Sequence, residues 1–335
     1  QYEMNIGIFT SSFGLRTDVY NIKDLVSDNP DITGTVASPR ISLLANLSSD
    51  WQFRAGYAKG YRAPQIYDED LHIESSGARR VTHINSPDLR QETSHSINSS
   101  IRYSSIIGTR SPIQTEFVAE GFYTKLQDPF SNEFSDMDES GNVSYMRINS
   151  ENGATVYGGN LELNLGFPNN IMLQTAYTRQ KSQYEEAQQW GEEETSTNKA
   201  FIKSPDSYGY LSLSYTPKQG FSGSLTGIYT GSMLVPHFGL DPETDVPEEL
   251  EAIENNWVIT GERLEKTPAF LNMGAELSYA FILNKTLDVK ISTGVKNIFN
   301  QMQNFDSGIY RDPGYVYGPS YGRMITFGLE IGGGH

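Results

Sequence analysis

The sequence of 335 residues contains no cysteine. Without thiols the chain forms neither disulfide bridges nor thiolate metal sites, which excludes a disulfide-stapled scaffold. It also lacks any run of about 18 apolar residues, and its mean hydropathy is −0.46. A helical membrane protein is therefore excluded. A membrane β-barrel is not, because barrel strands are marked by alternation rather than by overall hydropathy.

Basic residues and tryptophans are also scarce. The 25 Lys and Arg residues are outnumbered by 41 Asp and Glu residues, so the formal net charge is −16. This balance argues against nucleic acid as a partner, because nucleic acid requires a basic surface. The aromatic residues include 20 Tyr but only 3 Trp. Tyrosine suits the interfacial girdles of a barrel, because its ring prefers an apolar environment and its hydroxyl prefers water.

Short stretches of alternating apolar and polar residues are the main structural signal. Residues 161–165, 271–279 and 287–293 each carry an apolar or small residue at every second position. Side chains of a strand point to opposite faces in turn, so each stretch predicts a strand with one apolar and one polar face. The charged residues of these stretches share the polar face: Glu162, Glu276, Asp288 and Lys290. In a soluble sandwich the apolar face would form a core, whereas in an outer-membrane barrel it faces lipid.

The alternation predicts about 13 strands. They span residues 3–12, 13–22, 38–49, 51–60, 94–105, 113–126, 154–166, 169–183, 204–216, 219–231, 268–283, 285–297 and 320–332. From the second strand on, short turns alternate with long connections, the latter at 23–37, 61–93, 127–153, 184–203, 232–267 and 298–319. This alternation is typical of an all-β, antiparallel up-and-down transmembrane β-barrel, whereas a Greek-key sandwich mixes the lengths. A large soluble β-protein with one solvated face remains the alternative.

The long connections are acidic, so nearly all of the net charge is predicted to lie on one rim. Residues 232–267 include Asp241, Glu243 and Asp245, which are candidate Ca²⁺ ligands because hard cations bind clustered carboxylates. No connection has the ligand order of an EF-hand. Ordinary solvated loop surface is the alternative interpretation.

Four motifs resemble those of TonB-dependent outer-membrane receptors, and they occur in the order typical of that family. The residues that carry the resemblance are Tyr61, Arg62, Ala63 and Pro64 at a strand end, Pro87, Asp88 and Leu89 before the next strand, and Asn297 near the C-terminus. The last motif comprises residues 317–331, which resemble the final strand of the family. The match departs from the family pattern at Gln91, where the family has proline. Pro64 also has a purely architectural reading, because proline cannot donate a hydrogen bond to a strand ladder.

The resemblance implies a barrel of about 22 strands that encloses an N-terminal plug. Residues 1–332 are then expected to form the C-terminal portion of the barrel, and 333–335 a tag remnant. We expect neither the plug nor the TonB-binding segment within this chain. Because 13 strands are too few for such a barrel, we also expect that the sheet does not close on itself.

The family is located in the outer membrane of Gram-negative bacteria, which implies a multi-pass membrane protein. Its members actively import metal chelates, such as iron siderophores, haem or cobalamin, which are captured by long extracellular loops. The implied partners are the TonB complex, reached through the plug, together with outer-membrane lipid and the metal-chelate ligand. A surface lipoprotein is a further candidate partner.

Candidate ligand-binding residues lie in and after the first motif. His72 and His83 occupy the connection in which haem-importing relatives carry an axial ligand, and imidazole is a standard ligand of haem iron. Both histidines can equally be ordinary loop surface. The remaining candidates are Tyr61, Arg62, Arg79 and Arg80, whose charges would also suit a siderophore or cobalamin.

No catalytic set is recognisable, so we expect no enzymatic activity. Two other functions remain open. One is a passive porin or structural barrel, which would not require energy for uptake. The other is an outer-membrane barrel enzyme, such as a phospholipase or protease, which would act on lipid or peptide substrates.

Overall fold

The fold was analysed in a computed structural model, and it consists almost entirely of β-strands. The structure describes residues 1–23, 31–64, 81–134, 143–150, 152–191, 195–217, 219–238, 247–255, 260–283, 287–303 and 317–333. None of the helices within these ranges is long and apolar enough to cross a lipid bilayer.

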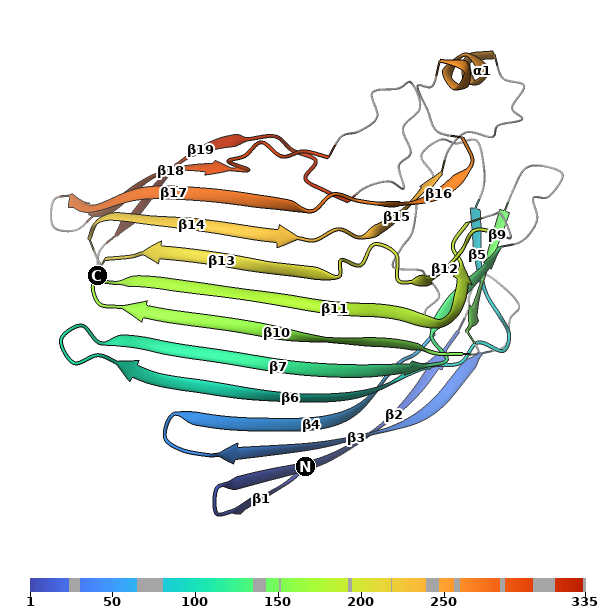
Figure 1. The fold of residues 1–335 in the computed structure, drawn as a ribbon, viewed down its shortest axis with the longest axis horizontal. Helices are drawn as coiled ribbons and strands as arrows, with labels where there is room; N and C mark the ends of the chain where they lie inside the picture. The colour runs from blue at the N-terminus through green and yellow to red at the C-terminus, as the bar shows by residue number, and fades with distance from the viewer. Residues whose placement is uncertain are drawn as a thin grey trace.

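Thirteen strands follow one another as hydrogen-bonded neighbours in a single antiparallel sheet (Figure 1). They are β1 (Tyr2–Ile6), β2 (Phe9–Ile22), β3 (Ile32–Asn46), β4 (Trp51–Arg62), β6 (Glu92–Ile107), β7 (Ile113–Gln127), β10 (Ala154–Phe167), β11 (Ile171–Gln189), β13 (Ser207–Tyr215), β14 (Gly220–Thr230), β17 (Phe270–Leu283), β18 (Leu287–Lys296) and β19 (Met324–Gly333). A fourteenth strand, β12 (Thr197–Ala200), pairs with β11 beside this path. The order confirms the predicted up-and-down topology.

The remaining elements belong to the long connections. They are β5 (Val81–Asn85), β8 (Phe130–Phe134), β9 (Val143–Asn149), β15 (Leu234–Phe238), β16 (Glu262–Lys266) and the helix α1 (Pro247–Glu254). Strands β5, β9 and β8 form one small sheet, and β15 and β16 form another. Sequence patterns did not predict these elements, because each strand has only five to seven residues.

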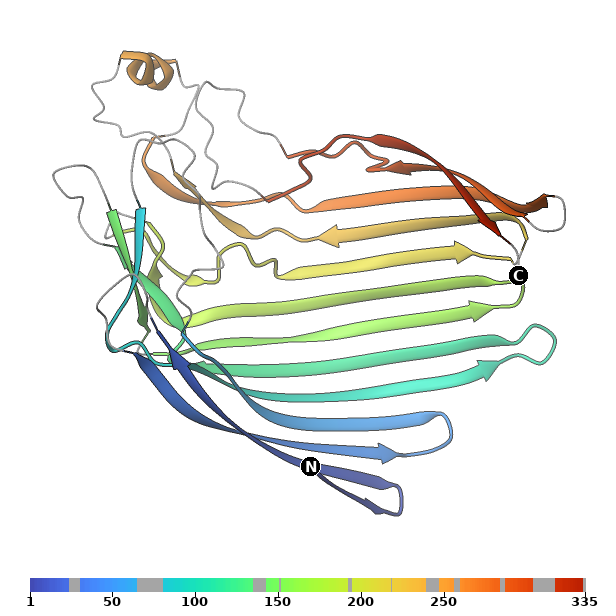
Figure 2. The same cartoon turned by 180° about the vertical axis from the view of Figure 1, so that it is seen from behind.

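The long connections all lie at one end of the main sheet, and the short turns lie at the other end. This follows from the antiparallel order, and Figures 1 and 2 show the same separation from opposite sides. The long connections carry the small sheets and α1. The predicted separation of short turns from long connections is therefore confirmed, and the end with the long connections is called the loop end below.

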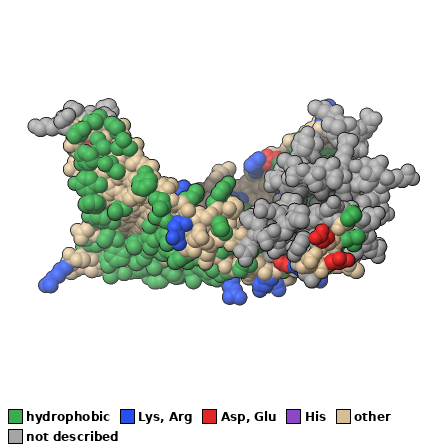
Figure 3. Space-filling model, turned by 90° about the horizontal axis from the view of Figure 1, so that it is seen from above, with side chains coloured by type: hydrophobic (Ala, Val, Ile, Leu, Met, Phe, Trp, Pro, Cys, Tyr) green, Lys and Arg blue, Asp and Glu red, His purple; other side chains and the backbone are tan. Residues whose placement is uncertain are grey.

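The register separates an apolar outer face from a polar lumen face. Leu161 lies opposite Ala119 on one side and Tyr177 on the other, and these positions share the outer face. The charged residues predicted for the polar face all lie on the opposite, lumen face: Glu162, Glu276, Asp288 and Lys290. Figure 3 shows hydrophobic side chains along the outer side of the curved sheet.

Apolar exposure on the outer face is too extensive for a soluble protein. Ile97, Leu161 and Phe327 are 58%, 52% and 84% exposed. Within the described ranges, the buried apolar side chains other than prolines are only Val36, Ala45, Leu89, Ala154, Val235 and Val289. A sheet without a packed core on its apolar side needs another apolar environment, and lipid supplies one.

Two aromatic girdles bound the apolar band of the outer face. Near the short turns they include Trp51, Tyr103, Tyr215, Phe221 and Tyr279. Near the loop end they include Tyr57, Tyr123, Tyr157, Tyr177 and Tyr229. On β4 the two girdles are separated by the six residue steps from Trp51 to Tyr57, about 20 Å along the strand.

The main sheet is open. Strands β1 and β19 occupy its two ends and are not hydrogen-bonded to each other (Figure 1). This agrees with the expectation that the described strands do not close on themselves. Strand β19 includes Gly333, whereas residues 334 and 335 lie outside the described ranges. The tag remnant therefore remains a prediction.

Several predicted strand boundaries are wrong, and among them β11 extends to Gln189 rather than ending at residue 183, while β19 begins at Met324 rather than at residue 320. The first turn lies at Gly7 and Ile8 rather than between residues 12 and 13, and Gly14 lies within β2. The reason is that Gly7 has a φ of 60°, a conformation that glycine adopts without a Cβ clash. In addition, β3 begins at Ile32 rather than at residue 38. Residues 32–39 of β3 pair with β2 alone, whereas pairing with β4 begins at Arg40.

Candidate functional site

The Tyr-Arg-Ala-Pro motif and the Pro-Asp-Leu motif meet at the loop end of two adjacent strands. Arg62 is the last residue of β4, and its register partner is Glu92, the first residue of β6. Pro64 is fully buried and Leu89 is 3% exposed. The buried members of the two motifs therefore anchor the connection at both of its ends, and Arg62 and Glu92 lie next to them at the ends of the two strands.

Arg62 and Arg147 share one aromatic ring. The guanidinium carbon of Arg62 lies 4.8 Å from the ring centroid of Phe130, and that of Arg147 lies 5.7 Å from it. Both distances are within the range of a cation–π contact. A carboxylate oxygen of Glu92 accepts a hydrogen bond of 3.2 Å from the backbone N–H of Phe130. Residues from β4, β6, β8 and β9 thus converge at one place.

Tyr184 extends this arrangement from β11. It lies seven residues beyond Tyr177 of the aromatic girdle, and so outside the membrane-spanning part of the strand. Burial raises the pKa of the Tyr184 phenol, and the Glu92 carboxylate raises it further, whereas Arg62 acts in the opposite direction. Its ring packs on Phe201 at a centroid distance of 4.5 Å. Tyr184 therefore stays protonated, as a hydrogen-bond donor, at neutral pH.

We call Arg62, Glu92, Phe130, Arg147 and Tyr184 the inner-rim cluster. By register, Arg62, Glu92 and Tyr184 lie on the lumen face of their strands. At the mouth of the lumen the exposed guanidinium group of Arg62 provides hydrogen-bond donors and positive charge, whereas Arg147 is only 9% exposed and Glu92 adds one negative charge. Guanidinium groups bind carboxylate and related oxyanions in a planar, bidentate manner. The arrangement therefore suits an anionic ligand that approaches from the loop end.

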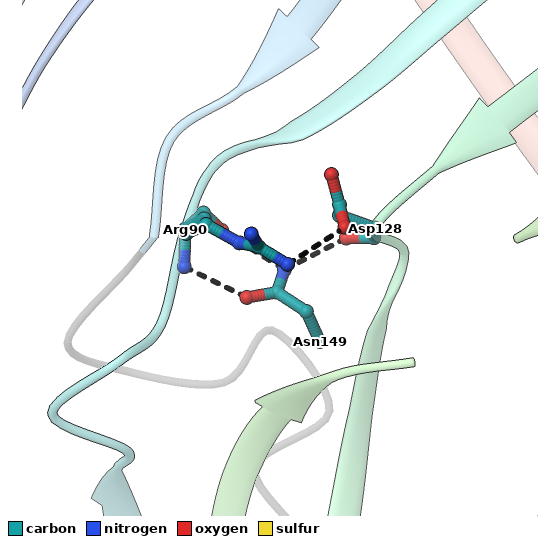
Figure 4. Close-up of polar contacts among 3 residues, drawn as sticks. All are labelled: Arg90, Asp128 and Asn149. Carbon is teal, nitrogen blue, oxygen red and sulfur yellow. Dashed lines mark hydrogen bonds and ion pairs between the residues drawn. The ribbon is translucent and has the colours of Figure 1, made fainter. Parts of the chain in front are cut away.

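A polar clamp holds the segments that build the cluster (Figure 4). Arg90 donates a hydrogen bond to Asp128 over 3.0 Å, in an ion pair between the start of β6 and the end of β7. Asn149, the last residue of β9, accepts a bond of 2.7 Å from the backbone N–H of Arg90. Its amide nitrogen donates to the backbone carbonyls of Arg90 and Asp128, over 3.0 and 2.7 Å. Three chain segments are thus tied together directly beside Phe130.

Of the other predicted ligand residues, the structure describes Tyr61 and the backbone of His83. The ring of Tyr61 stacks on that of Tyr20 with centroids 6.2 Å apart. His83 belongs to β5, whose backbone pairs in parallel with β9, but its side chain lies outside the described part of the structure. The predicted residues that lie outside the described ranges altogether are His72, Arg79, Arg80, Asp241, Glu243 and Asp245. Within those ranges, no three His, Asp or Glu side chains are grouped as a metal site would require.

Asn297 organises the connection between the last two strands. It is 4% exposed, has a φ of 50°, and directly follows β18. Its amide nitrogen donates to the carbonyls of Gln301 and Tyr321 over 2.7 and 2.9 Å. Its side-chain oxygen accepts a bond of 3.0 Å from the N–H of Gln301. The residue therefore satisfies backbone groups where the ladder ends, which is an architectural role.

Sequence patterns did not identify Glu92, Phe130, Arg147 or Tyr184 as site residues. Glu92 begins a strand, Tyr184 continues one, and Phe130 and Arg147 lie in a connection that was expected to be a loop. The only usable signal was the proximity of the two motifs in sequence. The pairing of β5 with β9, which brings two separate connections together, has no local signature.

Comparisons with known proteins agree with this architecture. A family model described as "TonB dependent receptor-like, beta-barrel" matches residues 1–298. A comparison with curated proteins found no significant match. Similar solved structures are the FrpB iron transporter from Neisseria meningitidis (F3-3 variant), with a TM-score of 0.62 and 15% identity, the ferripyoverdine receptor of the Pseudomonas aeruginosa outer membrane, with 0.64 and 13%, and the ferric-catecholate import receptor Fiu from E. coli K12, with 0.57 and 15%.

These matches cover 98%, 98% and 96% of this chain, but only 43%, 37% and 42% of the respective solved chains. The chain thus spans less than half the length of each structure. At such low identity, the likeness establishes the fold alone. The family model, however, covers most of the chain. The chain therefore belongs to the TonB-dependent receptor family, and it forms part of an outer-membrane β-barrel of that family.

Proposed function

We propose that this chain is the C-terminal barrel portion of a receptor that actively imports an anionic metal chelate across the outer membrane. The long connections would capture the chelate, and TonB would supply the energy through a plug. Membership of the family supports the proposal. The similar structures are described as an iron transporter, a ferripyoverdine receptor and a ferric-catecholate import receptor. The proposal assigns no catalytic role to the chain.

The observation that carries the substrate class is the pair of guanidinium groups in the inner-rim cluster. Arg62 and Arg147 approach the same ring of Phe130, on an otherwise acidic chain of net charge −16. Such a chain repels anions in general. The two guanidinium groups outnumber the single carboxylate of Glu92 and would provide a localised attraction, in which the exposed Arg62 rather than the buried Arg147 would contact the ligand. An anionic chelate, for example one bearing carboxylate or catecholate oxygens, is the ligand class that this charge would select.

The open edges of the sheet support a further part of the proposal. Strands β1 and β19 would leave unpaired backbone groups in lipid, at a cost of several kcal/mol for each group. We propose that strands outside this chain pair with both edges and close the barrel around the plug.

Replacing Arg62 by glutamine in the complete receptor should raise the chelate concentration for half-maximal uptake by about tenfold, because one charge-assisted bidentate contact is lost. Arg62→Lys should be intermediate, since lysine keeps the charge but not the planar fork. Uptake of a radiolabelled ferric chelate in living cells is the measurement. The matched control is Arg54→Gln, which removes a basic group from the lumen face of the same strand.

Two outcomes would contradict the proposal. Equal losses in Arg62→Gln and Arg54→Gln would show that the inner-rim cluster is not the binding site. Undiminished uptake in cells that lack TonB would indicate passive diffusion and hence a porin.

If the chelate is haem, His72 and His83 are the proposed iron ligands. Neutral imidazole coordinates iron, so haem affinity should decrease as the pH falls below the ordinary histidine pKa of about 6.5. The complete receptor carrying both His72→Ala and His83→Ala should lose the Soret shift of the wild type in a haem titration. An unchanged Soret band and affinity would exclude these ligands and leave a siderophore or cobalamin as the substrate.

A further inference from the structure

The hydrogen-bond ladder between β3 and β4 stops short of the loop end. Its last register pair is Arg40 and Ala58, although β3 extends to Ile32 and β4 to Arg62. Over this last stretch β3 pairs with β2 alone, and β4 pairs with β6 alone. The β3–β4 ladder therefore does not reach the strand end that carries Arg62.

The side chain of Tyr20, on β2, spans this gap. Its register partner on β3 is Gly34, and a Cβ at that position would overlap the phenol ring. Because glycine has no Cβ, the ring of Tyr20 can lie across β3 and stack on that of Tyr61, with the centroids 6.2 Å apart and the planes at 19°. The hydroxyl of Tyr20 donates a hydrogen bond of 2.5 Å to the side-chain oxygen of Gln91. One side chain thus connects β2 with the end of β4 and with the segment that leads into β6.

The hydroxyl of Tyr20 stays protonated and can therefore donate this bond. Gly34, its register partner, lies seven residues beyond Ile41, which pairs with Tyr57 of the aromatic girdle, so Tyr20 is outside the membrane-spanning part of β2. Burial raises the pKa of the Tyr20 phenol, and the neighbouring Tyr61 raises it further. The ordinary pKa of tyrosine is already well above neutrality, so the phenol is a donor at neutral pH.

Both contacts of Tyr20 adjoin the inner-rim cluster. Tyr61 directly precedes Arg62, and Gln91 directly precedes Glu92. On its other side, Gln91 adjoins the polar clamp drawn in Figure 4. A tyrosine that does not belong to the cluster therefore holds the immediate neighbours of two of its members.

Gln91 is also the position at which this chain departs from the motif of its family, which has proline there. The side chain of proline has no hydrogen-bond acceptor, so proline could not receive the bond from Tyr20. The link between Tyr20 and Gln91 is therefore a feature of this chain rather than of the family motif.

We propose that Tyr20 is a positioning residue for the inner-rim cluster, and that it acts through Tyr61 and Gln91 on Arg62 and Glu92. This inference rests on the proposed function, in which Arg62 contacts an anionic chelate. Ordering a long side chain and its strand end on binding lowers the affinity, and a strand end that is already held in place reduces this cost. Tyr20 would thus raise the affinity for the chelate without touching it.

The affinity of the complete receptor for a ferric tris-catecholate, measured by isothermal titration calorimetry in detergent, tests the proposal. Tyr20→Phe keeps the ring but loses the hydroxyl, and it should weaken binding about fivefold. Gly34→Ala displaces the ring of Tyr20 and should weaken binding about tenfold, because the stack is lost as well. The matched control is Gly14→Ala on β2, where an added Cβ would meet no other atom, and it should bind like the wild type.

A double-mutant cycle with Arg62→Gln separates positioning from direct contact. In the Arg62→Gln background, Tyr20→Phe should cause less than about a twofold further loss, because the group that it positions is absent. Losses that simply add would overturn the proposal, since Tyr20 would then act independently of Arg62. Undiminished affinity in both Tyr20→Phe and Gly34→Ala would also overturn it. Unchanged affinity in Arg62→Gln alone would instead refute the proposed function.

Amide hydrogen exchange without ligand tests the positioning independently of any chelate. Peptides that cover residues 61–63 and 89–92 should exchange about fivefold faster in Tyr20→Phe than in the wild type. Gln91→Leu removes the other end of the same hydrogen bond and should give the same increase, and the two changes together should give no more. Exchange that is unchanged in both single variants would overturn the proposal even if Arg62 binds the chelate.

Discussion

A lysine in place of Leu163 should destabilise the folded receptor by about 2–4 kcal/mol. Leu163 lies on the outer face of β10 and has Phe117 and Thr175 as its register partners. It is located between Tyr157, in the girdle of the loop end, and Phe167, near the short turn. An ammonium group there must enter the hydrocarbon core or extend towards a distant headgroup, and both are unfavourable.

The matched control for this substitution is Gln174→Lys on the neighbouring strand. Gln174 lies opposite Asn164 on the lumen face, so its replacement should change the free energy of unfolding by much less. Urea-induced unfolding of the complete receptor in phospholipid vesicles measures both values. Equal destabilisation by the two lysines would mean that the two faces do not differ in environment, and the assignment of lipid and lumen would be wrong.

The main sheet was predictable because its signal is local and repeated. In each strand, the alternation of apolar and polar residues indicates which side chains face lipid and which face the lumen. Glu162 and Asp288 lie on the predicted lumen face, because a charge on the lipid face would be energetically costly. The alternation of short turns and long connections then predicted which strand ends lie at the same end of the sheet. Even so, the first turn was misplaced, because the alternation continues across Gly7 and does not reveal where the chain reverses.

The inner-rim cluster was predictable only in part. Arg62 was identified through its motif, but its contact with Phe130 depends on how two separate connections fold over the rim. Strands β5 and β9 come from different connections and pair in parallel, a contact that no local pattern specifies. Arg147 is placed by this pairing. A cluster of side chains assembled from separate connections therefore cannot be predicted from local patterns, whereas the strands of the main sheet can.

A cysteine introduced at Glu251 should react with a membrane-impermeant maleimide in intact cells, whereas one at Thr109 should not. Glu251 is an exposed residue of α1, which belongs to a long connection, and Thr109 is exposed in the short turn between β6 and β7. Barrels of the outer membrane place long connections outside the cell and short turns in the periplasm. The chain has no cysteine of its own, so the labelling background is low.

The expected difference is nearly complete labelling at Glu251 against almost none at Thr109, and both sites should react once the outer membrane is permeabilised. Exposure matters for the choice of site. Ser196 also lies at the loop end but is only 5% exposed, so a cysteine there would react slowly for a structural reason unrelated to topology. Labelling of Thr109 alone in intact cells would invert the orientation. The inner-rim cluster would then face the periplasm, which would contradict the proposal that it binds a chelate arriving from outside the cell.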